Sequence, residues 1–367
     1  MKIQAALVTA THQPIQIETL ELDSPHRGEV VVRIAACGVC HSDYHLISGA
    51  TQHPLPVVPG HEGAGVVETV GEGVTHIQPG DHVVLNWAPA CGRCFYCLRG
   101  KPNLCDTFVG PIWAGVMMDG TPRLSWRGRP VYHFSALAAF AERVVVPQET
   151  CIVIRKDVPL TVAALVGCAV TTGVGAVLYT AQVQAGERVA VFGCGGVGLS
   201  VLMGARLAGA QQIIAIDQLP KKLDLARRFG ATHTINAAEV DTIEAVRGLT
   251  EGRGADVAFE AVGVPQLQAD CVEAVRPGGK AVLVGLSAVG STTPLSGARI
   301  VRQEKVVMGS YYGSANTVHD FPLLLDLYMA GKLDLDALVS HTYELSQINQ
   351  AFEAMLSGEV ARGVVVF

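Results

Sequence analysis

The sequence has little charge, because Asp, Glu, Lys and Arg together make up only 16% of its 367 residues, against a usual share of about 25%. With 49% hydrophobic residues, the chain as a whole cannot be disordered and has ample material for packed cores. At roughly 150 residues per domain, its length predicts two domains. There is no run of Lys or Arg, and the net charge is −6, so we expect no nucleic-acid partner.

Long hydrophobic runs are also missing. The longest apolar stretch, 162–179, is interrupted by Thr, Gly and Cys, and it predicts a buried helix rather than a membrane span. The first residues, MKIQAALV, lack the pattern of a signal peptide and predict an ordinary strand. We therefore expect a cytoplasmic protein with no membrane partner. In that reducing compartment the ten cysteines are expected to serve metal binding, redox chemistry or burial rather than disulfides.

The pattern of the chain changes near residue 171. The first 150 residues are short β-branched runs broken by Gly and Pro, which predict a β-rich domain with long loops. After residue 171, strands alternate with glycine turns and helices, which predicts a parallel, doubly wound α/β sheet. Its six expected strands are Arg188–Phe192, Gln212–Ile216, Thr232–Ile235, Asp256–Glu260, Lys280–Gly285 and Lys305–Ser310. The tail predicts helices at Asp320–Ala330 and Ser346–Ser357 and a strand at Gly363–Phe367, which we expect to pair with the first domain.

A dinucleotide-binding motif follows the first of these six strands. Gly193, Gly195 and Gly198 form Gly-x-Gly-x-x-Gly at the start of a helix, where glycines allow a tight turn, close approach of the pyrophosphate and close helix packing. The next strand ends in Asp217, placed to accept hydrogen bonds from the adenosine ribose. A 2′-phosphate would meet that carboxylate as a like charge, so NAD is favoured over NADP. The alternative is a glycine turn in another α/β protein, with Asp217 as a plain strand-end cap.

Four cysteines are closely spaced in one loop: Cys91, Cys94, Cys97 and Cys105. Four thiolates can close a tetrahedron around Zn²⁺ with no open position, which marks a structural site. Four buried thiols, or an iron–sulfur cluster, are the alternatives. A second set of cysteines and histidines lies at 37–43, 60–63 and 167–169, and spacing alone does not assemble these segments into one site.

Together these segments resemble the zinc-dependent alcohol dehydrogenases of the medium-chain dehydrogenase/reductase superfamily. The resemblance covers essentially the whole chain. It rests on CGVCHSD at 37–43, GHEGAGVVE at 60–68, the four-cysteine loop, GCAVTTGVG at 167–175 and the glycine motif. It implies a GroES-like β-barrel catalytic domain, residues 1–170 with 312–367, and an inserted Rossmann NAD-binding domain, residues 171–311.

The resemblance also implies roles for individual residues. Cys40, His61 and Cys168 look like ligands of a catalytic zinc, with Glu62 a nearby carboxylate and Asp43 orienting His61. Ser42 matches the hydroxyl that takes the alcohol proton, and His45 matches the histidine that passes it on. The residues matching cofactor contacts are His41, Thr172, Gly193, Gly195, Gly196, Val197, Gly198, Asp217, Lys222 and Arg362. The expected cofactors are therefore NAD and two zinc ions per chain, one catalytic and one structural.

The substrate expected from the resemblance is a small alcohol or aldehyde. Trp87, Phe134, Leu286 and Tyr311 align with positions that line the substrate channel, although any of them could be ordinary core packing. We expect NAD-dependent oxidation of primary alcohols, benzylic alcohols among the candidates, by a homodimer or tetramer.

The sequence is also compatible with other functions. The segment 119–134 resembles the long loop of glutathione-dependent formaldehyde dehydrogenases, so a thiol-adduct dehydrogenase of the mycothiol or glutathione type is an alternative. Thr51, His53 and Val109 stand where the glutathione type carries two acids and an arginine, which argues against glutathione adducts. The complete zinc motifs argue against a zinc-free quinone reductase, and Ser42 with His45 argues against a non-catalytic NAD-binding zinc protein.

Overall fold

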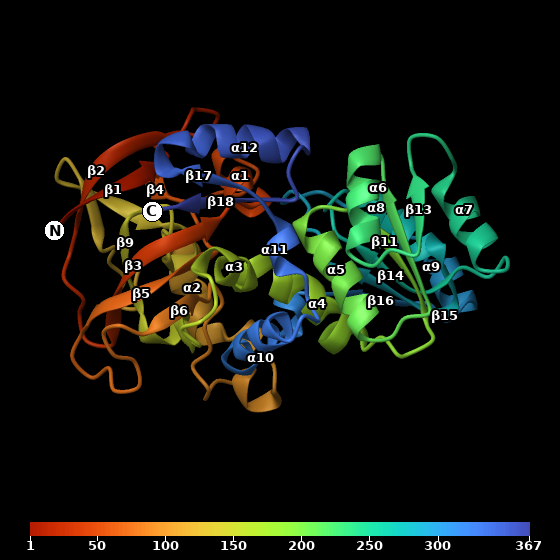
Figure 1. The fold of residues 1–367 in the computed structure, drawn as a ribbon, viewed down its shortest axis with the longest axis horizontal. Helices are drawn as coiled ribbons and strands as arrows, with labels where there is room; N and C mark the ends of the chain where they lie inside the picture. The colour runs from red at the N-terminus through yellow and green to blue at the C-terminus, as the bar shows by residue number, and fades with distance from the viewer. The chain divides into compact units, whose positions relative to one another are not determined.

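The computed structural model describes residues 1–367, and the chain divides into two compact units. The first comprises Met1–Cys168 and Asn316–Phe367, and the second comprises Ala169–Ala315. Figure 1 shows the course of the chain from the red N-terminus to the blue C-terminus.

The first unit is built from two β-sheets. One has the strand order β1-β2-β7-β8-β4, and the other β10-β6-β5-β3-β18-β17 with β9 also paired to β3. Its strands are β1 (Lys2–Leu7), β2 (Gln16–Leu22), β3 (Glu29–Gly38), β4 (Val57–Val58), β5 (Gly63–Val70), β6 (His82–Leu85), β7 (Leu124–Trp126), β8 (Arg129–His133), β9 (Arg143–Pro147), β10 (Cys151–Ile154), β17 (Val339–Glu344) and β18 (Arg362–Val366). Its helices are α1 (His41–Ile47), α2 (Asp106–Ala114), α3 (Leu160–Leu165), α10 (Thr317–Met329), α11 (Leu335–Leu338) and α12 (Ile348–Ser357).

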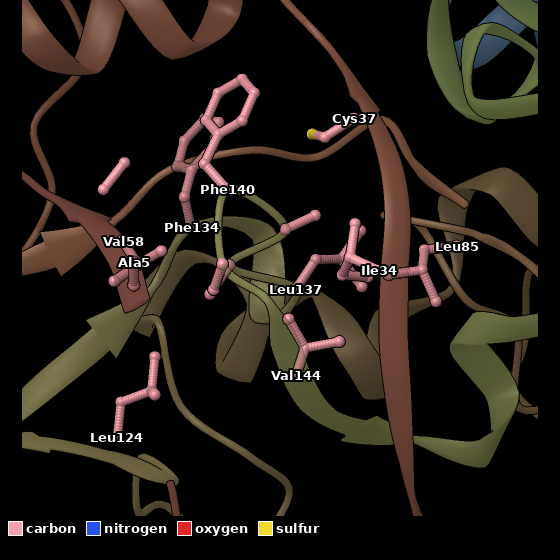
Figure 2. Packing of buried hydrophobic residues seen from close by; sticks show 14 of the residues in the cluster. Ala5, Ile34, Cys37, Val58, Leu85, Leu124, Phe134, Leu137, Phe140 and Val144 are labelled. Atoms are coloured by element: carbon pink, nitrogen blue, oxygen red, sulfur yellow. The ribbon is translucent and has the colours of Figure 1, made fainter. Parts of the chain in front are cut away.

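Strand β3 is the centre of this unit. Its sequence EVVVRIAACG is rich in β-branched residues, and eight of its ten residues are buried, as expected for a strand covered on both faces. It pairs with β5, β9 and β18. Figure 2 shows side chains from both sheets in one core, among them Ala5 of β1, Leu124 of β7 and Ile34 of β3. The pairing of β18 with β3 confirms that the tail returns to the first part of the chain.

The second unit contains one parallel sheet of order β13-β12-β11-β14-β15-β16, which confirms the six predicted parallel strands. The strands are β11 (Arg188–Phe192), β12 (Gln212–Asp217), β13 (His233–Asn236), β14 (Ala255–Glu260), β15 (Val275–Leu283) and β16 (Val306–Gly309). The helices are α4 (Thr171–Gly175), α5 (Gly196–Leu207), α6 (Pro220–Arg228), α7 (Thr242–Leu249), α8 (Pro265–Ala274) and α9 (Gly297–Arg302).

Some element boundaries differ from those expected. Strand β15 begins at Val275 rather than Lys280, because Val275 already pairs with Ala255 before a register shift. The predicted long loop at 119–134 contains the hairpin β7–β8. Single 3-10 turns lie at Cys97–Arg99, Pro102–Leu104, Phe134–Ala136, Gln148–Thr150, Tyr312–Ser314 and Leu345–Gln347.

The longest helical stretch, Leu160–Ala181, combines α3 and α4 with two π-helical segments, Val166–Val170 and Ala176–Ala181. By length and composition it could cross a membrane, but 89% of its most apolar window is buried inside the protein. The apolar run 162–179 is therefore a buried helix, as predicted from its sequence.

Candidate active site

Four potential metal ligands of the first unit lie together: Cys40, His61, Glu62 and Cys168. Their ligand atoms all lie within 4.8 Å of one another, and all four residues are buried. Cys40 immediately precedes α1, His61 and Glu62 precede β5, and Cys168 lies in a π-helical turn, a geometry that recurs at functional sites. The structure therefore assembles the three segments that spacing alone could not connect.

Glycine makes this close approach possible. Gly60 has φ +98°, and a Cβ there would lie 2.4 Å from the backbone nitrogen of Phe140. A Cβ on Gly38 would lie 2.1 Å from Oε2 of Glu62. A side chain at position 60 would push the ligand-bearing segment away from the backbone of Phe140, and one at position 38 would push the Glu62 side chain out of its place.

His61 is held with one ring nitrogen directed at the other ligands. Its Nδ1 lies 3.1 Å from Oδ1 of Asp43, which also accepts a 2.8 Å hydrogen bond from the backbone N–H of Gly60. Its Nε2 is buried without a hydrogen-bond partner. A carboxylate on one nitrogen and an unsatisfied second nitrogen are the usual arrangement of a metal-ligating histidine.

The charges of the cluster shift the pKa values of its members. The hydrogen bond between the two thiols lowers the pKa of Cys40 and raises that of Cys168, so Cys40 is the first to become a thiolate. Burial alone would lower the pKa of His61, but the charges of Asp43 and Cys40 raise it instead. Since a ligand must be deprotonated to bind a cation, metal binding here releases protons.

Glu62 pairs with Arg362 of β18. The Arg362 guanidinium donates a hydrogen bond to Oε2 of Glu62, while Oε1 is buried without a partner. Burial raises the pKa of Glu62 to about 7, although the charge of Arg362 opposes the shift. The sequence predicted Arg362 as a pyrophosphate contact and did not reveal this ion pair. With Glu62 engaged by Arg362, the two thiols and the imidazole fit Zn²⁺ as three protein ligands, which leaves a fourth position open for substrate.

Two aromatic rings stand beside the cluster. The rings of Trp87 and Phe134 lie edge-on to His61, with centroid distances of 6.4 and 5.6 Å. Ser42 and His45 are one turn apart on α1, both half-buried, while His41 begins the same helix. Leu286 and Tyr311 belong to the second unit, where they are 59% and 40% exposed; their predicted role in a substrate pocket stays a prediction.

The four-cysteine loop forms the other cluster. The sulfur atoms of Cys91, Cys94, Cys97 and Cys105 lie within 4.8 Å of one another. The hydroxyl of Thr107 donates a 3.2 Å hydrogen bond to Sγ of Cys91, which lowers the pKa of that thiol to about 6. Four convergent sulfurs with no further ligand fit a closed structural zinc site.

The glycine motif lies where β11 meets α5 in the second unit. Gly193 has φ +93°, and a Cβ on Gly198 would lie 1.8 Å from the carbonyl oxygen of Gly193. A Cβ on Gly195 would meet nothing within 4 Å, so the space beside this turn is open. The opening lies at the N-terminus of the 12-residue helix α5, and helix N-termini are sites where phosphate groups bind. Gly196 and Val197 begin that helix.

Asp217 at the end of β12 is fixed by two backbone groups. Its Oδ2 accepts a 2.9 Å hydrogen bond from the N–H of Cys194, and its Oδ1 accepts a 3.0 Å bond from Leu219. The carboxylate is thus oriented beside the glycine turn. Lys222 lies in the first turn of α6 and Thr172 lies in α4. The glycine turn and Asp217 form a cradle that fits a dinucleotide, while the coenzyme contacts of Lys222 and Thr172 stay predictions.

A doubly wound sheet with this cradle, and a β-rich unit with one closed and one open zinc site, define a zinc-dependent dehydrogenase. Residues 26–156 match the alcohol dehydrogenase GroES-like domain, and residues 196–330 match the zinc-binding dehydrogenase domain. The chain is 40% identical to the NDMA-dependent alcohol dehydrogenase of Amycolatopsis methanolica, covering 100% of this chain and 99% of that protein.

Two further relatives are similar over their whole length. The S-(hydroxymethyl)glutathione dehydrogenase of Paracoccus denitrificans is 38% identical, with full coverage of both chains. The crystal structure of benzyl alcohol dehydrogenase from Acinetobacter calcoaceticus superposes with a TM-score of 0.95 at 32% identity, covering 100% of this chain and 99% of that one. This chain belongs to the zinc-dependent alcohol dehydrogenases of the medium-chain dehydrogenase/reductase superfamily. The fold class, the enzyme class and the zinc and NAD cofactors expected from the sequence are thereby confirmed.

Proposed function

We propose that this enzyme oxidises primary alcohols, benzylic alcohols among them, with NAD⁺ and reduces the corresponding aldehydes with NADH. The observation that carries the proposal is the cluster of Cys40, His61 and Cys168, in which His61 is oriented by Asp43 and presents an unsatisfied Nε2 to the other ligands. Zinc held by these residues would acidify an alcohol oxygen or polarise a carbonyl, and NAD⁺ would be the hydride acceptor.

The chain's own groups would position the substrate and move its proton. Ser42 takes the proton of the substrate hydroxyl, and His45, one turn further along α1, passes it to solvent, since an imidazole accepts and donates protons near neutral pH. Glu62 would be a carboxylate close to the bound metal, and Arg362 donates a hydrogen bond to it. The glycine turn with Val197 receives the pyrophosphate, Asp217 and Lys222 the adenosine ribose, and His41, Thr172 and Arg362 complete the coenzyme contacts.

One feature favours an aromatic substrate, and another disfavours a charged one. Trp87 and Phe134 give the catalytic cluster an aromatic wall. Thr51 and His53, which stand where the glutathione type carries acids, line a separate cavity of about 300 Å³ near the end of α1 that contains no Asp, Glu, Lys or Arg. The charged peptide groups of a glutathione adduct would find no ionic partner at Thr51 and His53, so the thiol-adduct dehydrogenase is the second candidate.

The remaining parts of the proposal concern the whole protein. We assign the GroES-like catalytic domain to residues 1–170 with 312–367 and the coenzyme domain to residues 171–311. We further propose that the enzyme works in the cytoplasm as a homodimer or tetramer.

The test is NADH formation from aliphatic alcohols, benzylic alcohols and S-hydroxymethylglutathione, with zinc measured on the same samples. We expect two zinc ions per chain and preference for benzylic or aliphatic alcohols in the parent. Cys40→Ala should lose one zinc ion and at least about a hundredfold in activity. The matched control is Cys37→Ala, which removes a buried thiol outside the cluster. This variant should keep both zinc ions and the parent's activity. Turnover by Cys40→Ala at the parent rate would refute the zinc mechanism, and preference for the thiol adduct would establish the second candidate.

A further inference from the structure

A buried glutamate of the second unit ties together two loops at the carboxyl edge of the sheet. Glu260, the last residue of β14, has no exposed surface. Its Oε1 accepts hydrogen bonds from the backbone N–H groups of Val262 and Gly263, at 2.8 and 2.7 Å. Its own carbonyl oxygen accepts from the N–H groups of Val284 and Gly285, both at 2.9 Å. One residue therefore fixes the loops that follow both β14 and β15.

These two loops pack backbone against backbone. Gly263 has φ +88°, and a Cβ there would lie 2.4 Å from the carbonyl oxygen of Leu286. A Cβ on Gly285 would lie 2.1 Å from the nitrogen of Gly263. The loop after β14 also contacts the glycine turn: Cγ2 of Val262 lies 2.3 Å from the position that a Cβ of Gly193 would occupy. A shift of the loop after β14 would thus disturb both the loop after β15 and the glycine turn.

The strand order indicates which part of the coenzyme this loop faces. The sheet runs β12-β11-β14-β15 across its middle, and a dinucleotide lies across the carboxyl ends of such strands at the point where the strand order reverses. Asp217 marks the adenosine end at β12, and the glycine turn marks the pyrophosphate at β11. The nicotinamide half therefore extends over the ends of β14 and β15, where the side chains of Val262 and Leu286 are exposed.

We propose that Glu260 is a positioning residue for the nicotinamide half of NAD, which it supports by holding the loop Ala261–Gly263 in place. This inference rests on the proposed NAD-dependent function. Glu260 itself does not touch the coenzyme; it acts through the two N–H groups that its carboxylate fixes. The second loop has its own support, because Gln268 of α8 donates a 2.9 Å hydrogen bond to the hydroxyl of Ser287.

Binding of two ligands to the zinc-loaded, full-length protein tests the proposal. NADH contains the nicotinamide half, whereas ADP-ribose lacks the nicotinamide ring. We expect Glu260→Ala to weaken NADH binding roughly tenfold, because two backbone groups lose their charged acceptor. ADP-ribose binding should change by less than about threefold, because the glycine turn and Asp217 are retained. NADH fluorescence and calorimetry with ADP-ribose give the two dissociation constants.

Two conservative variants separate position from charge. Glu260→Gln keeps an oxygen within reach of both N–H groups and should bind NADH like the parent. Glu260→Asp keeps the charge but withdraws it by one methylene, and should bind NADH more weakly than Glu260→Gln. These two variants carry the test if Glu260→Ala does not fold. The matched control is Asp256→Ala. Asp256 lies at the opposite end of β14, where its carboxylate accepts a hydrogen bond from the Arg188 N–H. Its removal should leave the ratio of the NADH and ADP-ribose dissociation constants unchanged.

The outcomes are distinct from those of the proposed function. Equal weakening of NADH and ADP-ribose, or stronger NADH binding by Glu260→Asp than by Glu260→Gln, would overturn the positioning role while the parent's activity stands. A parent that binds neither ligand would overturn the proposed function and this inference together.

Discussion

At the scale of single residues, the first unit contains a buried arginine that organises its surroundings. Arg123 is 1% exposed, and its guanidinium donates to both carboxylate oxygens of Glu29 at 2.6 and 2.9 Å. Its backbone N–H donates a 3.0 Å hydrogen bond to Nε2 of His133. Glu29 balances the positive charge of Arg123. The imidazole of His133, however, must stay neutral to accept the hydrogen bond from the Arg123 N–H.

His133 is therefore expected to make stability depend on pH. Burial, together with the charge of Arg123, lowers the pKa of His133 to about 3, against about 6.5 in an unfolded chain. The unfolded state binds the proton first as pH falls, so this contribution is complete above pH 6.5 and is lost progressively between pH 6.5 and 3. At pH 5 the loss should reach about 2 kcal/mol.

Urea unfolding of the parent and of His133→Gln at pH 7 and pH 5 measures this effect. The glutamine amide oxygen can still accept from Arg123, but glutamine does not titrate. The stability difference between the two proteins should shrink by about 2 kcal/mol at pH 5. Parallel pH curves for the two proteins would contradict the assignment.

At the scale of elements, the four-cysteine loop depends most on a bound ion. Between Cys91 and Cys105 it contains only two single-turn 3-10 helices. The apolar cluster beneath it is small, with Phe108 and Ile112 of α2 as its largest members. So little buried surface cannot hold a loop of this length, and structural zinc supplies the missing folding energy.

Replacing one of its thiols should release the loop. Cys105→Ser removes a buried ligand, and we expect zinc to fall from two ions to one per chain, with new proteolytic cleavage confined to residues 91–114. Cys151→Ala, a buried cysteine of β10 outside both clusters, is the matched control and should retain both ions and resist the protease. Unchanged zinc content in Cys105→Ser would show that the loop holds no structural zinc.

At the scale of the whole molecule, the C-terminal segment completes the unit in which the chain begins. Strand β18 lies between β3 and β17 (Figure 1) and pairs with Gly38, Cys37 and Ala36 at the end of β3 that leads into the catalytic cluster. It also carries Arg362, which contacts Glu62 from 300 positions away in the sequence. Without β18 the first unit therefore lacks an internal strand of its sheet and the arginine that pairs with Glu62.

Truncation tests this dependence. Deleting residues 361–367 removes an internal strand and leaves Ala36–Gly38 of β3 and the whole of β17 without their partner, so that unpaired edges become a site for aggregation. We expect loss of the catalytic zinc and of soluble protein, measured by metal analysis and size-exclusion chromatography. Deleting only Phe367, which follows β18 and is 39% exposed, should leave both unchanged. A 361–367 deletion that stays monodisperse with two zinc ions would contradict this role of β18.

The sequence by itself determined the features that depend on neighbouring residues. Glycine spacing predicted the turn between β11 and α5, cysteine spacing predicted the closed metal site, and alternating apolar runs predicted the parallel sheet. These properties follow from backbone freedom, ligand reach and side-chain periodicity, which act over a few residues.

Only the tertiary structure brought Cys40, His61 and Cys168 together, paired Arg362 with Glu62, and showed that Glu260 holds two loops at once. From the sequence, the zinc ligands could be proposed only by resemblance. The pair of Arg362 with Glu62 and the role of Glu260 could not be proposed at all, because in the sequence Glu260 is simply a polar residue at the end of a strand. Such contacts join segments far apart in the chain, and their geometry is set by sheet pairing and core packing rather than by any local pattern.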